Sequence, residues 1–314
     1  MNKILILGGT GFVGSHLCEK LTRLAWRSTV PTRRLAGAKH LWMLPLLDLL
    51  EADVHDEAAL TRLVAGHDAV VNLVGILHGN EAAFDKMHVQ LPQKLARACA
   101  ATGVRRVVHV SALGAGNDAP SMYQRSKARG EEVLRAADLD LTVLRPSVIF
   151  GPEDKFLNLF ARLQRAFPVL PLAGSAAKFQ PVWVEDVAEA VVASQQERAS
   201  MGKTYEACGP QVLTLKELVQ LAGRYSGHER PIISLPMALG RLQALLMELA
   251  PGEPLISRDN LDAMTVDNIA SGLLPGLQAL GITATALAAI APSYLAAQGP
   301  EDGLLRMRKT AGRF

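Results

Sequence analysis

Short apolar runs alternate with stretches of helical periodicity through the first half of the chain. The runs predict six strands, at 3–7, 28–32, 49–54, 69–77, 106–113 and 141–150. Between them, apolar residues recur at helical spacing at 15–25 and 90–102. The runs are apolar throughout rather than alternating, which indicates a sheet covered on both faces. The pattern predicts an α/β fold of the Rossmann type, a doubly wound parallel sheet whose ligands bind at the carboxyl ends of the strands.

The regular alternation of predicted strands and helices ends after residue 150. Proline-rich turns interrupt short helices from Gly151 onward, and no comparable series of strands follows. Within this half, residues 178–210 contain a helix and a strand that we expect to return to the sheet. We therefore predict a Rossmann domain over 1–150 together with 178–210, and a smaller substrate lobe formed by 151–177 and 211–314.

The composition fits a globular protein and excludes some classes of function. The 314 residues suffice for one large or two moderate domains, and 49% hydrophobic with 20% charged residues excludes disorder. Lys and Arg number 33 against 30 Asp and Glu, which leaves a net charge of +3 scattered along the chain. An excess this small does not make a nucleic-acid footprint, so no nucleic-acid partner is predicted.

Cysteine and histidine usage argues against disulfide and metal chemistry. Cys18, Cys99 and Cys208 are an odd and widely spaced set, and the eight histidines show no ligand spacing. We predict no metal site, and a reducing compartment fits these thiols best. The apolar run near the N-terminus is only about five residues long, too short for the core of a signal peptide. The sequence therefore favours a cytoplasmic location.

One uncharged stretch complicates that assignment. No residue between Asp267 and Glu301 is charged, and this length would suffice for a membrane span of about 20 residues. Pro275, Gly276, Gly281 and Pro292 interrupt the stretch, so two short core-facing helices are favoured over a span. A peripheral membrane contact stays open, through this stretch or through an apolar helix predicted at 239–249. The basic end of the chain, 304–314, is predicted to be frayed.

The strongest chemical signal is a glycine cluster that follows the first strand. Gly8, Gly11 and Gly14 form G-x-x-G-x-x-G and open a predicted helix. Gly8 allows a tight turn, Gly11 lets backbone approach a pyrophosphate, and Gly14 lets the helix pack close to the sheet. The phosphate would meet free N–H groups at the positive end of the helix. Directly after a strand, the pattern favours dinucleotide binding over a mere tight turn.

The ends of the next strands indicate which dinucleotide binds. The second strand ends in Thr32, Arg33 and Arg34, where an acidic residue would bind the ribose 2′-hydroxyl of NAD. Arginine binds phosphate oxygens bidentately, so NADP(H) is the preferred cofactor and NAD(H) the alternative, unless both arginines are merely solvated. Asp53, after the third strand, is placed to accept from the adenine amino group, or it caps the next helix. Residues 72–75 follow the fourth strand, where a small residue lets the cofactor pass.

The second strong signal is Tyr123 and Lys127, a Y-x-x-x-K pattern on a stretch predicted to be helical as far as Ala137. A spacing of four places the phenol and the ammonium on one helix face. We expect the lysine to lower the pKa of the tyrosine and to hold the nicotinamide ribose. Tyr123 would then exchange the proton in a carbonyl–alcohol interconversion. After the fifth strand of a dinucleotide fold, this pattern outweighs an accidental surface pair.

Other polar residues receive mainly structural interpretations. Glu185 and Asp186 precede an apolar helix and are predicted to cap its N-terminus. His16 is predicted to pack on the first helix. Residues 153–155 (Glu-Asp-Lys) follow the sixth strand near the expected cleft, where they contact substrate or form a solvated loop.

Several motifs together resemble one protein family. TGFVG (10–14), HVSALGA (109–115), Y-x-x-x-K, LRPSVIFGPEDKF (144–156) and QPVWVEDVA (180–188) resemble the extended, or atypical, short-chain dehydrogenase/reductase family, also called the NAD-dependent epimerase/dehydratase family. The passages GPEDKFLNLFARL and KFQPVWVEDVAEAVV are most similar to one branch of it. That branch contains the NADPH-binding accessory subunit of mitochondrial respiratory complex I and its bacterial relatives. The resemblance covers residues 2 to about 220.

The resemblance implies a set of site residues. The cofactor-binding residues would be Gly8, Thr10, Gly11, Phe12, Val13, Gly14, Arg33, Arg34, Asp53, Val54, Leu73, Val74, Gly75, Val110, Ser111, Tyr123, Lys127, Pro146, Ser147 and Val148. The catalytic residues would be Tyr123, Lys127 and Ser111. The family places a further Ser or Thr one or two positions after Ser111, where this chain has Ala112 and Leu113. Ser111 would instead cap the strand end or contact the cofactor.

The resemblance leaves two functions open. The first is an NAD(P)-dependent oxidoreductase or epimerase-type enzyme that transfers a hydride to or from an unidentified carbonyl or alcohol, with NADP(H) preferred. The second is a non-catalytic NADPH-binding module, associated with a respiratory or quinone-related assembly at the inner face of a membrane. Ala112, Leu113 and the apolar C-terminal segments favour the second. The sequence specifies neither the small-molecule substrate nor the oligomeric state.

Overall fold

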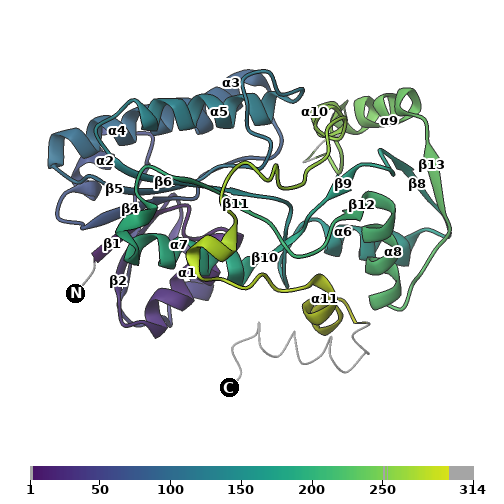
Figure 1. The fold of residues 1–314 in the computed structure, drawn as a ribbon, viewed down its shortest axis with the longest axis horizontal. Coiled ribbons are helices and arrows are strands. Elements are labelled where there is room, and N and C mark those ends of the chain that lie inside the picture. Colours follow the sequence, from purple (N-terminus) through teal and green to yellow (C-terminus); the bar gives the residue numbers. More distant parts are fainter. Residues whose placement is uncertain (1–2, 250–251, 253, 297–314) are drawn as a thin grey trace.

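Seven parallel strands form the centre of the molecule in a computed structural model, which describes residues 3–249, 252 and 254–296 (Figure 1). Their order is β11–β6–β5–β4–β1–β2–β3. The strands are β1 (Lys3–Leu7), β2 (Arg27–Thr32), β3 (Leu47–Glu51), β4 (Ala69–Asn72), β5 (Arg106–Val110), β6 (Asp140–Pro146) and β11 (Thr204–Ala207). The chain order reverses between β1 and β4, the place where such sheets bind ligands. The predicted Rossmann-type sheet is confirmed.

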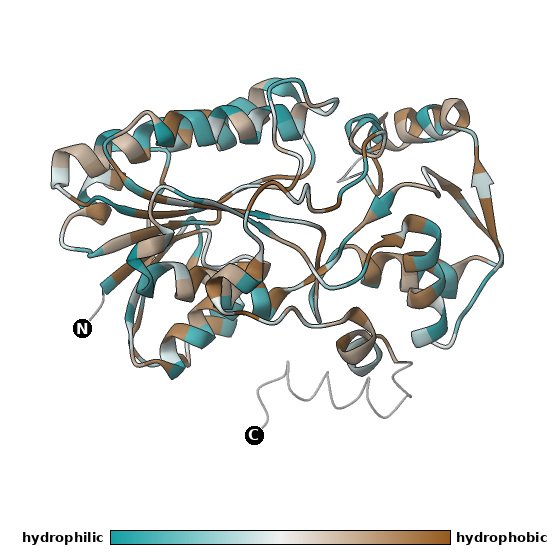
Figure 2. Ribbon diagram, viewed as in Figure 1, coloured by the Kyte–Doolittle hydropathy of each residue, from teal (hydrophilic) through white to brown (hydrophobic). Residues whose placement is uncertain are grey.

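Helices cover both faces of the sheet. The helices on one face are α1 (Phe12–Arg23) and α7 (Val184–Gln196), and those on the other are α2 (Glu57–Val64), α4 (Leu91–Thr102) and α5 (Met122–Arg135). Ile4 and Ile6 of β1 pack into the first layer, and Leu5 and Leu7 into the second. Figure 2 shows hydrophobic and hydrophilic residues interspersed along these helices, as expected for helices with one buried face. The strands are apolar throughout because both their faces are buried.

The smaller lobe lies at the other end of the molecule (Figure 1). It comprises α6 (Leu157–Ala166), β8 (Leu170–Ala173), β9 (Lys178–Phe179), β12 (Leu213–Thr214), α8 (Leu215–Tyr225), β13 (Ile232–Leu235), α9 (Met237–Leu249), α10 (Arg258–Ala263) and α11 (Leu287–Leu295). Its main core gathers around Phe150, Leu218 and Leu287. The domain boundaries proposed above stay a prediction.

As expected, the described residues after Gly151 form no series of strands comparable to that of the first half, but they do form short pairings that the sequence does not indicate. Strands β8 and β13 pair in parallel, β9 and β12 pair antiparallel, and β10 (Val182–Trp183) pairs with β7 (Ile149–Phe150). Each of these strands has only two to four residues. Such short pairings leave no continuous apolar run from which a strand could be predicted.

Several predicted strands of the central sheet end earlier than expected. The strand predicted at 69–77 ends at Asn72, and the one predicted at 106–113 ends at Val110. The strand predicted at 141–150 is interrupted after Pro146, and the one predicted at 49–54 instead covers 47–51. The residues beyond these ends are apolar because they stay buried in loops, as Ala112 and Leu113 do. These loops cross the carboxyl edge of the sheet, where the candidate site lies.

The segment after α10 returns to the sheet. Glu206 N–H in β11 donates to Pro275 O at 2.9 Å, and Leu277, Leu280 and Ile282 join the core under the sheet. The two short helices predicted here are confirmed as a 3₁₀ helix at Leu277–Leu280 and α11, and the apolar helix predicted at 239–249 is α9. The basic end 304–314 lies outside the described residues. Within the described ranges, no helix is both long enough and apolar enough to cross a bilayer.

Four short helices complete the described chain. A 3₁₀ helix, η1 (Leu35–Leu41), links β2 to β3, and η3 (Arg198–Ser200) follows α7. Between β4 and α4 the chain forms α3 (Glu81–Asp85) and then a π-helical turn, η2 (Lys86–Gln90). A π-helical turn is uncommon and often marks a functional site.

Candidate functional site

The glycine cluster forms the turn between β1 and α1, and each close approach requires glycine. Gly8 has a φ of +83°, and a Cβ there would lie 3.1 Å from the backbone of Leu73 and Val74 at the end of β4. A Cβ on Gly14 would lie 2.4 Å from Gly8 O, so only glycine lets α1 pack on the turn. These contacts fix the start of α1 at the carboxyl edge of the sheet.

The backbone at Gly11 is left open for a ligand. A Cβ on Gly11 would approach only Gly8 O, at 3.3 Å, and Gly11 is exposed. Gly11 is the N-cap of α1, no side chain caps the helix, and its first turn holds no acidic residue. The free N–H groups and the positive helix end therefore suit an anion such as a pyrophosphate. Thr10, Phe12 and Val13 are partly exposed beside this backbone.

The arginines after β2 are available for an anionic ligand. Arg33 and Arg34 are exposed, and neither forms an ion pair with an acidic residue of the described chain. His55 follows the end of β3. Burial lowers its pKa, and the positive charge of Arg33 contributes to the lowering, so Arg33 lies near the end of β3. Asp53 Oδ1 accepts from His55 N–H at 2.9 Å. The alternative that Asp53 caps α2 was wrong, because Asp56 is the cap.

The loop after β4 approaches the Y-x-x-x-K helix. Asn72 Oδ1 accepts from Val74 N–H at 3.2 Å and turns the chain at the sheet edge. A Cβ on Gly75 would lie only 3.1 Å from Lys127 Nζ, so the loop passes close to the end of the lysine side chain. The structure thus brings together Gly8, Val74, Gly75 and Lys127, which the sequence spreads over more than a hundred positions.

Tyr123 and Lys127 lie in the first turns of α5. Lys127 is buried, and its Nζ donates to Val110 O at 3.1 Å. Burial lowers the pKa of Lys127 to about 8, against the opposing effect of Glu131. Burial raises the pKa of Tyr123 to about 12. The expectation that lysine lowers the tyrosine pKa was therefore wrong for the protein alone, because removal of the phenolate from water dominates.

A buried ion pair lies beside the lysine. Glu131 is fully buried and binds Arg145 with two hydrogen bonds, of 2.9 and 2.7 Å, and Arg135 with one of 2.6 Å. Burial alone would raise the pKa of Glu131, but hydrogen bonding to Arg145 holds it below its ordinary value, with smaller contributions from Ser111 and Arg135. Glu131 is in turn the carboxylate that favours the charged form of Lys127.

Ser111 and Ser147 both face the protein interior. Ser111 is buried beside Glu131, and its hydroxyl makes no hydrogen bond of ordinary geometry. Ala112 and Leu113 after it are also buried. Ser147, between Pro146 and Val148, donates through Oγ to Asn268 Oδ1 at 2.6 Å. Neither hydroxyl has a free face directed at a substrate beside Tyr123 in this structure, and their cofactor roles stay a prediction.

One residue of the site was missed from the sequence. His88, in the π-helical turn η2, packs edge-to-face on the Tyr123 ring with centroids 5.5 Å apart. Its Nε2 accepts from Ile76 N–H at 3.1 Å, so Nδ1 carries the proton and donates to Ser126 Oγ at 2.8 Å. Burial, with Lys127 nearby, lowers the pKa of His88 to about 2 and keeps it neutral. No sequence signal marks it, since the π-helical turn has no recognisable pattern.

The start of α5 is held from the smaller lobe. Asp259 of α10 is buried and accepts from Met122 N–H at 2.5 Å and from Tyr123 N–H at 3.1 Å. Ser121, the N-cap, accepts from Gln124 N–H. A carboxylate at a helix N-terminus is favoured by the helix dipole. The position of Tyr123 therefore depends on both parts of the molecule.

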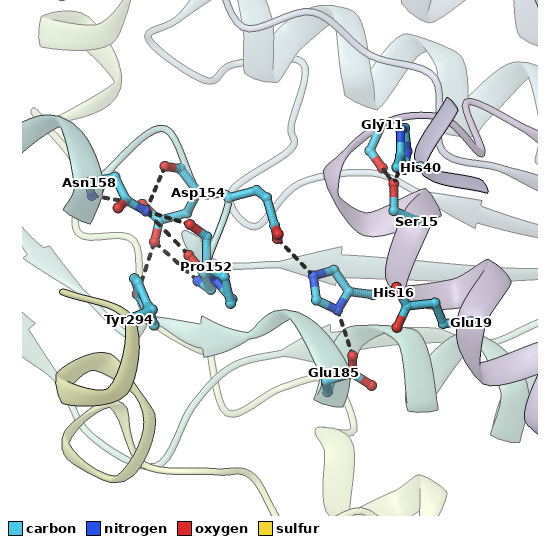
Figure 3. Close-up of polar contacts among 12 residues, drawn as sticks. Gly11, Ser15, His16, Glu19, His40, Pro152, Asp154, Asn158, Glu185 and Tyr294 are labelled. Atoms are coloured by element: carbon cyan, nitrogen blue, oxygen red, sulfur yellow. Dashed lines mark hydrogen bonds and ion pairs between the residues drawn. The ribbon is translucent and has the colours of Figure 1, made fainter. Parts of the chain in front are cut away.

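His16 links α1 to the smaller lobe, and the expectation that it only packs was wrong. Its ring lies between two carboxylates. Nδ1 lies 2.6 Å from Glu185 Oε1 (Figure 3), and Nε2 lies 3.2 Å from Glu153 Oε2. Burial would lower its pKa, but the hydrogen bonds to Glu185 and Glu153 raise it above 6.5. The expected caps of α7 were also wrong: Glu185 binds His16, and Asp186 accepts from Thr285 N–H.

This arrangement predicts a pH-dependent contribution to stability. A raised pKa in the folded state means that the contribution of His16 is complete below its unfolded value of 6.5 and is lost as the pH rises through the folded pKa. We expect the difference in free energy of unfolding between wild type and His16→Gln to be larger at about pH 5.5 than at about pH 9. Urea titrations at both pH values measure it; an equal difference at both would contradict it.

Asp154 is neither a substrate contact nor part of a solvated loop. It is buried, its Oδ1 accepts from Phe156 N–H at 2.8 Å, and its Oδ2 accepts from Tyr294 O–H at 2.9 Å (Figure 3). It therefore ties the start of α6 to α11. Within the described residues, no group of His, Cys, Asp and Glu side chains is arranged to hold a metal ion.

The parallel sheet, its order and the glycine turn at the switch point define a Rossmann α/β protein. The model of the NAD dependent epimerase/dehydratase family matches residues 4–208. The chain therefore belongs to this family, that of the extended short-chain dehydrogenases/reductases, as the motifs predict.

Three relatives illustrate the range of similar proteins. The chain is 32% identical over 291 residues to mitochondrial NADH dehydrogenase (ubiquinone) 1 alpha subcomplex subunit 9 of Mus musculus, covering 90% of this chain and 76% of that protein. It is 32% identical over 192 residues to the ceramide reductase of Caulobacter vibrioides, covering 60% of each. The structure of DesIV, a dTDP-glucose 4,6-dehydratase of Streptomyces venezuelae with NAD and TYD bound, is similar with a TM-score of 0.65 and 25% identity, over 74% of this chain and 85% of that one.

Proposed function

We propose that the protein is an NADP(H)-dependent oxidoreductase that interconverts a carbonyl and an alcohol. The observation that carries this proposal is the continuous contact from Gly8 through Val74 and Gly75 to Lys127. It joins an open, anion-binding helix start to the Tyr123 helix at one edge of the sheet. A dinucleotide laid along this edge would span both, with its phosphates at Gly11 and its nicotinamide ribose near Lys127.

The predicted residues divide between the two ends of the cofactor. The pyrophosphate would meet the backbone from Thr10 to Gly14, and the adenosine would lie between Arg33 and Asp53. Val54, Leu73 and Val74 would flank its path, and Val110 and Ser111 would lie under the nicotinamide ribose. Pro146, Ser147 and Val148 would border the nicotinamide. The solved relative that holds NAD supports a nicotinamide dinucleotide here.

The chemistry assigned to the chain is a proton transfer. NADPH, when bound, supplies a hydride to the carbonyl carbon of the substrate, which is thereby reduced. The carbonyl oxygen takes the proton of Tyr123, so an alcohol forms and the tyrosine is left as phenolate. A phenol whose pKa is raised to about 12 by burial is protonated at neutral pH and so carries the proton that the reaction needs. Lys127, charged below a pKa of about 8, stabilises the phenolate that results.

Two measurements test this function. Fluorescence titration with NADPH and NADH measures affinity, and mass spectrometry identifies any nucleotide that accompanies the purified protein. NADPH oxidation is then followed with a panel of aldehydes and ketones that includes long-chain ketones, since one relative is named a ceramide reductase. NADPH-dependent reduction of at least one compound is expected. A protein that binds neither nucleotide would contradict the proposal.

The preference for the 2′-phosphate rests on Arg33 and Arg34. We expect Arg33→Ala and Arg34→Ala each to weaken NADPH binding about 10- to 100-fold, because each would remove a charge-assisted hydrogen bond to phosphate. NADH affinity should change less than twofold, which provides the internal control. Arg23→Ala, an exposed arginine at the far end of α1, is the matched control variant. Equal losses of NADPH and NADH affinity would contradict a 2′-phosphate contact.

A second function is favoured by a different observation. Ala112 and Leu113 leave the usual hydroxyl position apolar, and one of the similar proteins is a mitochondrial NADH dehydrogenase subunit. The protein would then bind NADPH without turnover, gain stability from it and associate with a respiratory or quinone-related assembly at the inner face of a membrane. NADPH that copurifies and neither exchanges nor oxidises would favour this function. Rapid exchange with turnover would favour the first.

A further inference from the structure

Leu113 raises the question of what contacts the substrate oxygen besides Tyr123. Its apolar side chain is 3% exposed and cannot donate a hydrogen bond. Reduction of a carbonyl builds negative charge on the oxygen, and a second positioned donor usually stabilises that charge. Ser111 cannot supply the donor, because it is buried beside Glu131. A donor from another part of the chain is therefore needed if the proposed reaction is to run efficiently.

Asn268 brings an amide group to this position. It lies in the segment that returns from α10 to the sheet, and its Nδ2 is 3.4 Å from Leu113 O. Its backbone is fixed on both sides: its N–H donates to Lys178 O at 2.8 Å, and its O accepts from Gln180 N–H at 3.1 Å. Asn268 itself is partly exposed. A rigidly held and partly accessible amide thus adjoins the residue that replaces the usual hydroxyl.

The hydrogen bonds determine which way the amide points. Ser147 Oγ accepts from Gln180 N–H at 3.3 Å and donates to Asn268 Oδ1 at 2.6 Å. The carbonyl oxygen of the amide is therefore engaged by Ser147, and the NH₂ group is on the side of Leu113. An NH₂ group has two N–H bonds, and the long contact to Leu113 O engages one at most. The other is available to a ligand.

The amide lies at the same strand end as the proposed catalytic pair. Lys127 Nζ binds Val110 O, three residues before Leu113 in the same chain segment. Gly114, the residue after Leu113, also packs on α5, because a Cβ there would lie 2.6 Å from Gln124 Nε2. Asn268 therefore approaches the end of β5 from the smaller lobe, while the Tyr123 helix approaches it from the sheet domain.

The geometry points to Asn268 as the donor that binds the substrate oxygen together with Tyr123, in place of the missing hydroxyl. This inference rests on the proposed oxidoreductase function. The amide N–H would hydrogen-bond the carbonyl oxygen as charge develops there, and the proton would still come from Tyr123. No bond to Asn268 forms or breaks.

Substitutions at Asn268 and Leu113 test the inference with the carbonyl compound that the panel identifies. Asn268→Asp keeps an acceptor for Ser147 and removes the donor, and Asn268→Ala removes both. Both should lower kcat about 10- to 100-fold while the Kd for NADPH stays within twofold. Leu113→Thr in the Asn268→Ala background returns a hydroxyl to the usual position and should recover part of the lost kcat. Asp267→Ala is the control. It removes the carboxylate next to Asn268 that accepts a hydrogen bond from Lys178 N–H, and it should change kcat less than twofold.

The outcomes separate this inference from the function on which it rests. Unchanged kcat in both Asn268 variants would overturn the donor role and leave the oxidoreductase function standing. A loss of NADPH affinity as large as the loss of kcat would also overturn it, because the residue would then be supporting the cofactor site. Wild-type protein that binds NADPH and reduces none of the panel would instead contradict the oxidoreductase function, and the inference with it.

Discussion

Tyr123→Phe should lower NADPH-dependent turnover by about 10²- to 10⁴-fold, the range observed when a general acid is removed. The change deletes one oxygen and keeps the ring. The packing of that ring against His88 and Phe84, with centroids 5.5 and 6.1 Å away, is therefore preserved. The Kd for NADPH should stay within about threefold, because the proposed contacts of the cofactor lie mainly on the glycine turn, on Arg33 and Arg34 and on Lys127, and the phenol contributes little. Steady-state kinetics and fluorescence titration of the same preparation measure both quantities.

A matched control separates the loss of a proton donor from a general effect of the substitution. Tyr225→Phe alters a tyrosine of α8 in the smaller lobe, away from the β5 edge, and should leave turnover unchanged. Full activity in Tyr123→Phe would show that the proton comes from another group. Equal losses in both variants would show that the substitutions act on the fold rather than on the reaction.

Glu131→Ala should destabilise the protein by about 3–5 kcal/mol, the usual cost of breaking a buried ion pair by removing one partner. Glu131 has no exposed surface, and its loss leaves Arg145, whose side chain is 19% exposed, without its counter-ion. It also removes the carboxylate that keeps the pKa of Lys127 from falling further. Urea unfolding at neutral pH measures the free-energy change. NADPH binding by the variant should already weaken below about pH 8, because without Glu131 Lys127 loses its proton at a lower pH than in wild type.

The neighbouring glutamate provides the control. Glu132 is exposed and accepts one hydrogen bond from Asn117, so Glu132→Ala should change the free energy of unfolding by at most about 0.5 kcal/mol. Glu131→Gln keeps the shape of the side chain and should fall between the two. A loss below about 1 kcal/mol in Glu131→Ala would mean that water replaces the carboxylate and that the ion pair is not isolated from solvent.

The parts of the site that are local in sequence could be predicted from it. The glycine turn needs seven consecutive residues, and Tyr123 and Lys127 are one helical turn apart, so spacing alone indicates their geometry. The central sheet could be predicted because its strands are buried on both faces and are apolar throughout. The short strands of the smaller lobe lack such a signature, since a pairing of two residues leaves no periodicity to detect.

The rest of the site depends on contacts between distant residues. His88 meets Ser126 across 38 positions, and Asn268 meets Leu113 across 155. No local pattern specifies such pairs before the fold is known. The pKa of Tyr123 illustrates the same difficulty: helical spacing places a cation nearby, but the extent of burial, which dominates the shift, follows only from the packing around the ring.

The cap that Asp259 places on α5 has a consequence for dissecting this protein. The first N–H groups of α5 bind Asp259, which lies 137 positions after Met122 in the sequence. The N-terminal and C-terminal halves of the chain therefore cannot be exchanged independently without regard to this contact. A chimaera that took its glycine-rich half from this chain and a C-terminal half without a carboxylate at the position of Asp259 would leave the start of α5 without this anchor. Swapping substrate ranges between relatives therefore calls for transferring α10 and the beginning of α5 as one unit.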